Sequence, residues 1–385
     1  MGKHLVSKYA KIALTASCIC FILCLSACQN SAGQTQLHTF SPTATPTSTG
    51  AMALQVPGQK ATATPTHRPA PAGSSFQPGI ISSSASTTRP VLAFYYAWYS
   101  PSTWSVKTMS SLPTIRYNSS DDTTIERQLT WAAGAGITGF INSWWGNGDQ
   151  TDKNFARLLT HAANLESKTG YRFASSLYFE SDAPVLSGTT NMINALHYIV
   201  TQYANNPHFF HWQGKPVLFF WDPLGNGRTL AQWASIRSQV DPNHQMIWSA
   251  EGVSTSLLSV FDGLHLFSAG YWGIQNNNMA AVDQGFRAKI NAYNSANKTH
   301  KIWAAGVLPG YDDTHVPGRT GTYIVPRNNG GTYATSWTAA IASQPEWITI
   351  TSFNEWFEGA MIEPGVNYGT QYLSLTQQYA KQWHG

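Results

Sequence analysis

Three glutamates are crowded into the segment TSFNEWFEGAMIEPG, residues 351–365, and two of them, Glu355 and Glu358, are only three positions apart. On a continuing strand their side chains would face opposite sides, so they converge only if the strand ends near Trp356 and the chain turns at Gly359. On a turn or a helical winding, such a pair lies about 5–6 Å apart at Cβ. The spacing therefore predicts a carboxyl pair at the end of a strand.

A carboxyl pair of this kind has the chemistry to hydrolyse glycosidic bonds. Carboxyls about 5 Å apart fit a retaining hydrolase, and a separation of about 6.5–9.5 Å fits an inverting one. Trp356 and Phe357 stand beside the pair, and enclosure by these rings would raise the pKa of at least one carboxyl, as a general acid near neutral pH requires. The alternative is a solvated acidic loop, because two glutamates three apart are common.

Eight near-continuous apolar runs have the character of strands that are covered on both faces. They span residues 91–99, 137–145, 171–180, 216–222, 245–251, 263–272, 301–313 and 347–356. Helical spacing follows most of them, over about 190–205, 229–239, 276–296 and 335–343 and around Leu129, Phe155 and Leu375, whereas the link near 254–261 is short. Eight such units without a Gly-rich dinucleotide motif favour a (β/α)8 TIM barrel over residues 89–385, rather than a doubly wound sheet.

A barrel predicts where its site lies, because catalytic groups in this fold collect at the carboxyl ends of the strands. Flat rings stack on sugar faces, and carboxylates bind hydroxyls or move protons, so acids and aromatic residues at these ends indicate a carbohydrate cleft. The expected strand ends carry Trp98, Tyr99, Trp144, Trp145, Glu180, Asp222, Glu251, Tyr271, Trp272, Asp312, Asp313, Glu355 and Glu358.

The segment ITSFNEWFEGAMIEP resembles the signature of glycoside hydrolase family 99, the endo-α-mannosidases, which typically read ITSFNEWHEGTQIEP. Three further segments are similar to that family and occur in the same order: FYYAWYS in the first run, AGITGFINSWWG in the second and LPGYDDT in the seventh. The resemblance spans about residues 91 to 365, nearly the whole of the expected barrel. It implies retaining hydrolysis of an internal α-mannosidic linkage in a glycan. The 12 histidines are scattered and give no metal-ligand spacing, so neither a metal nor a cofactor is expected.

The resemblance also implies roles for individual residues. Glu355 matches the base that acts on the 2-hydroxyl of the substrate to give a 1,2-anhydro sugar, and Glu358 matches the acid that then serves as base. Together with the strand-end positions, it gives the candidate substrate-binding residues: Trp98, Trp144, Trp145, Glu180, Tyr271, Tyr311, Asp312, Trp356 and Glu363.

The sequence departs from the family pattern at Phe357, where the family usually has histidine, and at Ala360 and Met361, which replace threonine and glutamine. These changes remove polar contacts near the reducing-side sugar and bear on the substrate more than on the catalytic pair. Two alternatives therefore stay open. One is a hydrolase of another α-glucan or surface polysaccharide, and the other is a catalytically silent sugar-binding lipoprotein.

The N-terminus has the features of a bacterial lipoprotein signal. Lys3, Lys8 and Lys11 precede an apolar run over residues 12–25 that is short for a membrane span, and the run closes with LSAC, ending at Cys28. We expect lipidation of Cys28, with the protein held at the cell surface or in the periplasm by its lipid anchor only. Residues 29–88 are rich in Thr, Pro and Ser and predict a disordered linker.

The overall composition narrows the class of partner. Charged residues make up 11% of the chain and aromatic residues 13%, with 15 Trp, which suits neutral polar ligands such as sugars. The net charge is only +4, and no basic run beyond the N-terminus suggests nucleic acid. All 4 cysteines lie in the first 28 residues, so neither a disulfide framework nor a thiolate metal site is expected in the barrel. We expect a monomer.

Overall fold

The computed structural model of the chain describes residues 89–274 and 278–385. The expected signal, its Cys28 and the linker over 29–88 lie outside the described residues. Within them, no helix combines the length and the apolar character that crossing a membrane requires.

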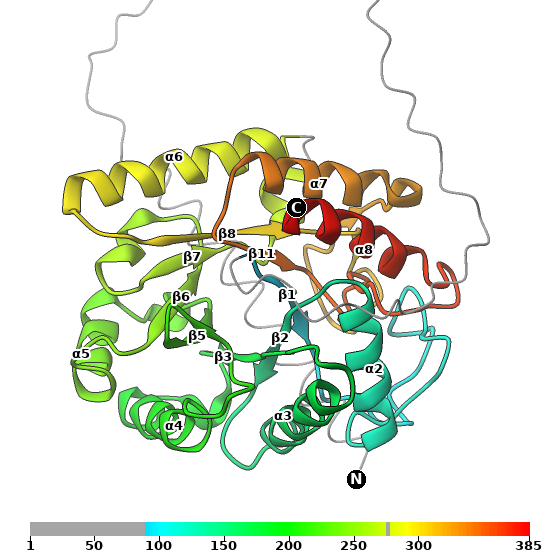
Figure 1. Cartoon of the computed structure of the whole chain (residues 1–385), viewed down its shortest axis with the longest axis horizontal. Helices are drawn as coiled ribbons and strands as arrows, with labels where there is room; N and C mark the ends of the chain where they lie inside the picture. Colours follow the sequence, from blue (N-terminus) through cyan, green and yellow to red (C-terminus); the bar gives the residue numbers. More distant parts are fainter. Residues whose placement is uncertain (1–88, 275–277) are drawn as a thin grey trace, which may run out of the picture.

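Eight parallel strands in this part of the chain form a closed barrel, which confirms the predicted (β/α)8 fold (Figure 1). Around the barrel the strand order is β3, β2, β1, β11, β8, β7, β6 and β5, and pairing of β3 with β5 closes the ring. These strands are β1 (Val91–Tyr95), β2 (Gly139–Trp144), β3 (Ser176–Glu180), β5 (Lys215–Trp221), β6 (Ile247–Glu251), β7 (Gly263–His265), β8 (Ile302–Val307) and β11 (Trp347–Ile350).

Helices surround the barrel as an outer layer (Figure 1). The α-helices are α2 (Asp122–Gly134), α3 (Gln150–Thr169), α4 (Thr189–Gln202), α5 (Leu230–Val240), α6 (Met279–Asn297), α7 (Gly331–Ala342) and α8 (Gln371–His384). Shorter turns are η1 (Pro184–Leu186), η2 (Gly225–Gly227), η3 (Thr255–Ser259), η4 (Gly270–Ile274, a π-helix) and η5 (Asn328–Gly330). The short η3 stands between β6 and β7, where the sequence predicts a short link.

Three two-residue strands lie outside the barrel. β4 (His211–Trp212) pairs antiparallel with the start of β5 and forms a hairpin at the N-terminal end of the barrel. β9 (Tyr311–Asp312) and β10 (Ile324–Val325) form a small antiparallel ribbon after β8.

Local sequence signals explain where several helices begin and end. The side chain of Asp149 accepts a hydrogen bond from the Thr151 amide and caps α3, which ends at Gly170 in the left-handed conformation with a φ of 73°. Thr229 and Gln232 form a capping box at the start of α5. These signals determine where α3 begins and ends and where α5 begins.

Two apolar layers hold the barrel together. One fills the space between the strands and the helices and includes Phe140, Trp248 and Trp303. The other fills the barrel interior, with Phe94 in the middle and Trp347 near the N-terminal end. Strands that contact apolar side chains on both faces read as continuous apolar runs, as the sequence does.

The expected strands are longer than the observed ones at their carboxyl ends. The run over 91–99 ends as a strand at Tyr95, because the amide of Tyr96 donates to the Asn354 side chain instead of to a neighbouring strand. The run over 263–272 ends at His265 and later becomes η4, and the run over 347–356 ends at Ile350. The residues beyond these points form loops at one rim of the barrel, which we call the mouth.

The described chain begins beside its own C-terminal helix. The Arg89 guanidinium donates to the Trp383 carbonyl at 2.8 Å, and the Trp383 indole donates to the Arg89 carbonyl at 3.0 Å. The guanidinium also lies 4.8 Å from the centre of the Trp383 ring. Since β1 starts two residues later, this clamp lies at the N-terminal end of the barrel, opposite the mouth.

Candidate active site

The loop after β11 turns sharply at the mouth and carries both predicted catalytic glutamates. Its two sides are joined by hydrogen bonds from the Ala360 amide to the Glu355 carbonyl at 3.2 Å and from the Ser352 amide to the Ala360 carbonyl at 2.8 Å. Gly359 has a φ of 60°, and a Cβ there would lie 2.7 Å from the Ser110 hydroxyl. Glycine is therefore needed for the turn that the sequence predicts near this position.

Glu355 is the more buried member of the pair, with 3% of its surface exposed. Its amide donates to the Ser352 hydroxyl at 2.6 Å, and its carboxylate accepts from the Phe357 amide at 3.1 Å. Burial raises the pKa of Glu355, and the nearby charge of Glu358 raises it further, whereas Arg319 lowers it. The two carboxyls therefore interact electrostatically, as a catalytic pair requires.

Glu358 is held by a buried arginine that sequence reasoning missed. Arg319 donates to the Glu358 carboxylate at 2.7 Å, to Asp313 at 3.1 Å and to the Tyr311 hydroxyl at 3.1 Å. Its side chain is only 3% exposed. It belongs to the long segment between β9 and β10, which has neither helical nor strand periodicity, so no pattern in the sequence connects Arg319 with the glutamates.

Three further carboxyls lie at the ends of neighbouring strands. Burial raises the pKa of Glu180 and of Glu251, each to about 8, and that of Asp222 to about 6. The Ser143 hydroxyl donates to Glu180 at 2.5 Å and partly offsets the effect of burial. Glu180 also interacts with the charge of Glu358, so the sequence-predicted Glu180 belongs to the same site as the pair.

Aromatic side chains form two walls of the mouth. On one side, the ring of Trp98 lies 4.8 Å from that of Tyr96 and 6.0 Å from that of Trp145. The Trp145 indole donates to the Ser143 hydroxyl at 3.0 Å, which connects this wall to Glu180. The predicted residues Trp98, Trp145 and Glu180 are therefore brought together.

The second wall lies next to Arg319. The rings of Tyr311 and Tyr323 stack at 4.5 Å, and Tyr271 lies 6.3 Å from Tyr323 with 40% of its surface exposed. Asp312 helps to shape this side, since its side chain accepts from the amide and hydroxyl of Thr314, at 3.1 and 2.6 Å. Its own amide donates to the Glu358 carbonyl at 2.8 Å, which joins the two loops.

Trp144 does not lie in the mouth, which corrects its prediction as a sugar contact. Its side chain is fully buried in the helical layer, where it stacks on Phe179 at 5.8 Å and donates to Asp152 at 2.9 Å. Trp144 is the last residue of β2, and Trp145 directly follows it, with its indole on the Ser143 hydroxyl and its ring beside that of Trp98.

Glu363 and Trp356, two further predicted sugar contacts, are buried and bonded to other side chains of the protein. The Glu363 carboxylate accepts from Tyr117 at 2.9 Å, Gln128 at 2.6 Å and the Trp356 indole at 2.9 Å. Protein donors already occupy this carboxylate, and Trp356 is fully buried. Both residues therefore support the loop that carries Glu355.

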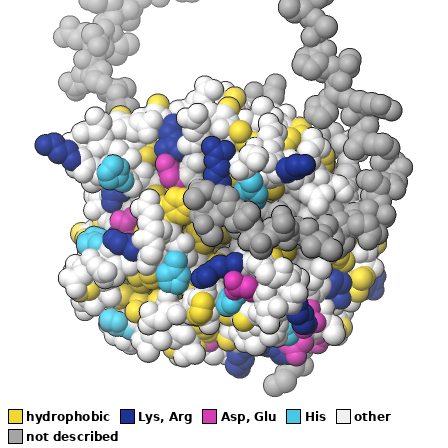
Figure 2. Space-filling view, viewed as in Figure 1, with side chains coloured by type: hydrophobic (Ala, Val, Ile, Leu, Met, Phe, Trp, Pro, Cys, Tyr) yellow, Lys and Arg dark blue, Asp and Glu magenta, His cyan; other side chains and the backbone are white. Residues whose placement is uncertain are grey.

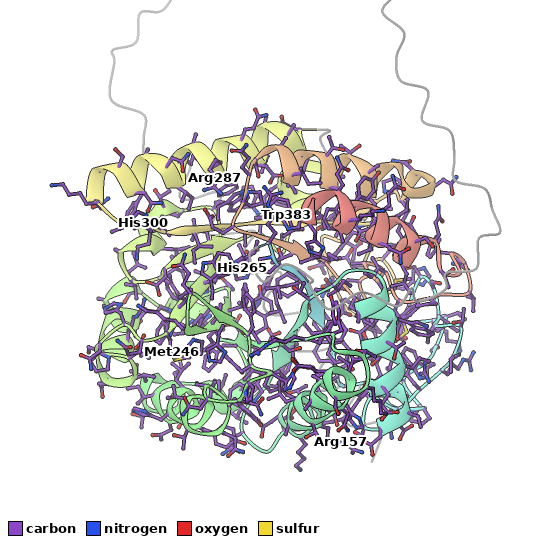
Figure 3. The ribbon with its side chains drawn as sticks, in the orientation of Figure 1. Arg157, Met246, His265, Arg287, His300 and Trp383 are labelled. Carbon is purple, nitrogen blue, oxygen red and sulfur yellow. The ribbon has the colours of Figure 1, made fainter. Side chains whose placement is uncertain are left out.

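The barrel interior below the mouth is closed by packed side chains. His265 lies inside the ring of strands (Figure 3), where its ring contacts the Ser249 hydroxyl at 3.0 Å and the Tyr178 hydroxyl at 3.2 Å. Burial lowers the pKa of His265 to about 3, so the ring is neutral. Among the described residues, no three acidic, histidine or cysteine side chains form a group that could hold a metal ion.

Comparison with known proteins agrees with this geometry. A family model described as glycosyl hydrolase family 99 matches residues 107–381. The glycoprotein endo-alpha-1,2-mannosidase of Mus musculus is 24% identical over 303 residues, covering 69% of this chain and 62% of that protein. An endo-alpha-1,2-mannosidase-like protein of Danio rerio is 27% identical over 303 residues, covering 69% of this chain and 65% of that protein. The chain thus spans less than two thirds of the length of these relatives.

Solved structures give the same result. The GH99 endo-alpha-mannosidase of Bacteroides thetaiotaomicron, in complex with bis-tris-propane, superposes with a TM-score of 0.64 at 25% identity, covering 76% of this chain and 97% of that one. A structure named glycoside hydrolase-like protein superposes with a TM-score of 0.59 at 15% identity, and so supports the fold alone. Since the family model covers most of the barrel, the chain belongs to glycosyl hydrolase family 99.

Proposed function

We propose that this protein is a retaining endo-glycosidase that cleaves an internal α-mannosidic linkage in a glycan. The observation that carries the proposal is the interacting pair of Glu355 and Glu358, held at the mouth of the barrel by the turn at Gly359. The names of the relatives, endo-alpha-1,2-mannosidase and endo-alpha-mannosidase, support the substrate class.

In the proposed first step, the Glu355 carboxylate takes the proton of the substrate's 2-hydroxyl. The freed O2 forms a bond to C1 as the bond from C1 to the leaving oxygen breaks, and Glu358 donates a proton to that oxygen. The product is a 1,2-anhydro sugar. In the second step, Glu358 takes a proton from water, whose oxygen forms a bond to C1 as the bond from C1 to O2 breaks, and O2 regains its proton from Glu355. Two displacements at C1 retain the anomeric configuration.

The environment of the pair suits this division of roles. Glu355 is buried with a raised pKa, so its carboxylate is a stronger base than an exposed one and is suited to a sugar hydroxyl. Glu358 is less buried, with 17% of its side chain exposed, and it forms an ion pair with Arg319 at 2.7 Å.

Reducing-end release tests the proposal. The full-length chain is incubated with yeast mannan, dextran and α-1,3-glucan, and new reducing ends are measured with their initial anomeric configuration. We expect release from mannan, with retained configuration. Release from dextran or α-1,3-glucan alone would replace the mannosidic linkage by another α-glucan linkage. Binding without release from any of these glycans would mean a silent sugar-binding protein.

We further propose that Cys28 is lipidated and holds the barrel at a bacterial membrane. The lipobox-like LSAC segment supports this proposal. Cells that express the chain are fed a labelled fatty acid, and the label is expected in the parent and not in Cys28→Ser. Equal labelling of both chains would contradict it.

A further inference from the structure

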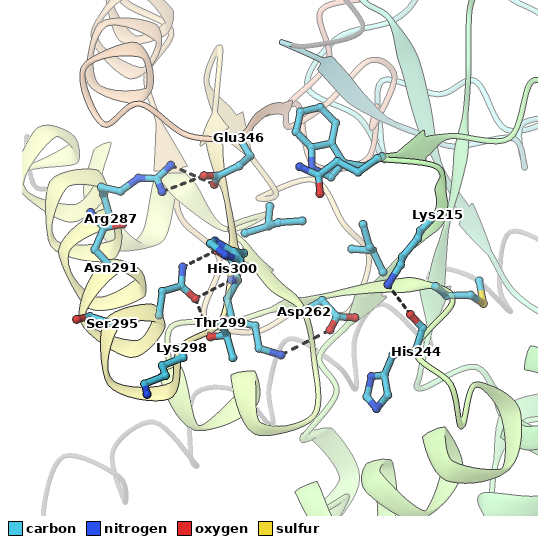
Figure 4. A pocket seen from close by; sticks show the side chains of 17 residues that line it. Lys215, His244, Asp262, Arg287, Asn291, Ser295, Lys298, Thr299, His300 and Glu346 are labelled. Atoms are coloured by element: carbon cyan, nitrogen blue, oxygen red, sulfur yellow. Dashed lines mark hydrogen bonds and ion pairs between the residues drawn. The ribbon is translucent and has the colours of Figure 1, made fainter.

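A second pocket lies on the face opposite the mouth, between the β4–β5 hairpin and the C-terminal end of α6 (Figure 4). Its volume is about 1090 Å³, which is large enough for several sugar units. Lys215, Ile247 and Ile302, which line it, stand at the starts of β5, β6 and β8. We call it the N-face pocket. It shares no lining residue with the candidate active site.

Basic side chains outnumber acidic ones in the lining of the N-face pocket. Two acids and six basic or histidine residues line it: Asp262, Glu346, Lys215, His244, Arg287, Lys298, His300 and Lys301. In the space-filling view, basic and histidine side chains gather over the region of β6, β7 and α6, with few acidic ones between them (Figure 2).

The two acids of the pocket are already neutralised by the protein. Glu346 pairs with Arg287 through two contacts of 3.1 Å, and Asp262 accepts from Arg237 at 2.6 Å and pairs with Lys301 at 3.5 Å. Lys215 and Lys298 lie on opposite walls of the pocket and carry positive charge that neither acid neutralises. Lys215 uses one donor on the His244 carbonyl at 2.7 Å, and Lys298 lies exposed at the end of α6. An ammonium group has three donors, so Lys215 keeps two for a ligand.

Hydrogen bonds within the protein hold the walls of the pocket in place. Asn294 accepts from the Thr299 hydroxyl at 2.9 Å and from the Lys301 amide at 2.6 Å, which fixes the loop after α6. Gln213, His244 and Lys298 have φ values of 51°, 49° and 53°. These values lie in the left-handed region, which glycine and asparagine adopt more easily. The backbone is therefore locally strained at three polar residues that line one pocket.

The other lining groups are those that bind sugars. The half-buried ring of Trp212 packs on Trp347 at 5.8 Å and also lines the pocket, together with the amides of Gln213 and Asn291 and the hydroxyl of Ser295. A stacking ring among amides and hydroxyls suits a sugar unit, and the surrounding ammonium groups suit an acidic substituent on it. The exposed large apolar residues of the described chain (Val106, Ile115, Val185, Tyr271, Ile324 and Val366) do not line this pocket.

We propose that the N-face pocket binds an anionic polysaccharide, with its acidic groups between Lys215 and Lys298 and one sugar ring against Trp212. This site goes beyond the proposed hydrolysis and is independent of it, because the mouth opens on the opposite face. Its role is to hold the enzyme on an acidic glycan while the mouth acts elsewhere.

The test compares two polymers that differ only in charge, carboxymethyl dextran and dextran, by affinity electrophoresis of the full-length chain. We expect carboxymethyl dextran to bind, with an affinity that falls as salt is added, and dextran not to bind. The double variant Lys215→Gln with Lys298→Gln should bind at least tenfold more weakly. The matched pair Lys153→Gln with Lys381→Gln removes the same charge from exposed positions outside the pocket and should change affinity less than twofold.

A second variant distinguishes a loss of binding from a loss of folding. Asn291→Glu adds a negative charge to the pocket and removes no lysine, and it should weaken binding at least fivefold with an unchanged melting temperature. Turnover of a short soluble substrate at the mouth should stay unchanged in all variants. Unaltered binding by both pocket variants, or equal losses in the control pair, would overturn the proposal. So would tighter pocket-dependent binding to phosphatidylglycerol vesicles or to oligodeoxythymidylate than to carboxymethyl dextran.

Discussion

Arg319 is the positive charge next to the carboxyl pair at the mouth. It contacts Glu358 directly, and its positive charge lowers the pKa of Glu355, which burial and Glu358 both raise. Glu355 acts as a base only when it is ionised. Activity should therefore rise as the pH passes upward through the pKa of Glu355, and Arg319 keeps this limb of the profile at lower pH.

We expect Arg319→Gln to move the acidic limb of kcat/KM to higher pH, because the pKa of Glu355 rises further once the positive charge is lost. Arg319→Lys keeps the positive charge, so its acidic limb should lie close to that of the parent. The control Arg157→Gln removes an arginine that pairs with the exposed Asp122 and should leave the acidic limb at the same pH. The measurement is kcat/KM across the pH range. An acidic limb at the same pH in Arg319→Gln and in the parent would exclude this role.

The two glutamates should differ on an activated substrate. Glu355→Gln and Glu358→Gln should each lower turnover of a natural linkage by about 100- to 10,000-fold, since each removes a proton-transfer group. A fluoride leaving group needs little protonation, so Glu358→Gln should recover much of its first-step rate on a glycosyl fluoride. Glu355→Gln should not, because the 2-hydroxyl still has to lose its proton. Near-normal turnover by both variants on a natural glycan would show that the glutamates are only loop charges.

At the scale of elements, the end of β2 places two adjacent tryptophans in different surroundings. The Trp144 indole donates to Asp152, and the Trp145 indole donates to Ser143. Trp144→Ala should lower the free energy of unfolding by about 3–5 kcal/mol, because it empties a buried site in the helical layer and leaves Asp152 without one donor. Trp145→Ala should instead weaken sugar binding by about 1–3 kcal/mol through loss of stacking. Denaturant unfolding and glycan titration of both variants measure the two effects. Equal losses of affinity would contradict the placement of these rings.

Helix α6 carries a buried carboxyl that has no hydrogen-bond partner among the described residues. Burial raises the pKa of Asp283 to about 8. A raised carboxyl pKa means that the folded state holds a proton that the unfolded state releases, so the barrel loses stability as the pH rises from about 4 towards 8. Asp283→Asn should abolish this loss, and its stability relative to the parent should therefore grow by a few kcal/mol between pH 5 and pH 8.

Denaturant unfolding at pH 5, 6, 7 and 8 measures the effect of Asp283→Asn. The control is Asp122→Asn, which removes an exposed carboxylate that Arg157 and His161 stabilise in its charged form. That variant should gain nothing as the pH rises. A constant difference between Asp283→Asn and the parent at all four pH values would show that Asp283 keeps its charge.

The sequence predicts the central part of each strand well and its carboxyl end poorly. The apolar run before Tyr95 reflects burial on both faces, which is a local property of each strand. The same apolar run continues to Trp98, which is half-buried by contacts that include Trp145, a residue just beyond β2, so the run does not show where the strand ends. The partners of Glu363, Tyr117 and Gln128, are more than 230 residues away in the sequence. No local pattern therefore predicts that its carboxylate bonds to the protein.

At the scale of the whole molecule, the barrel should not need the Thr/Pro/Ser-rich segment. Residues 29–88 lack the apolar spacing that packing requires, so a chain truncated to start at Arg89 should match the mature chain in turnover of a soluble substrate and in melting temperature. A markedly lower melting temperature of the truncated chain would show that the segment packs on the barrel.

Because the clamp between Arg89 and Trp383 brings the two ends of the described barrel together, we expect the site to form whichever of the eight units comes first in the chain. Because the first strand and the last helix meet at one point, a short peptide joining Gly385 to Arg89 would make the chain circular without moving the glutamates. The circle could then be opened at the exposed turn at Gly170, after α3. Such a circularly permuted chain would begin with the third strand and still place Glu355 and Glu358 side by side.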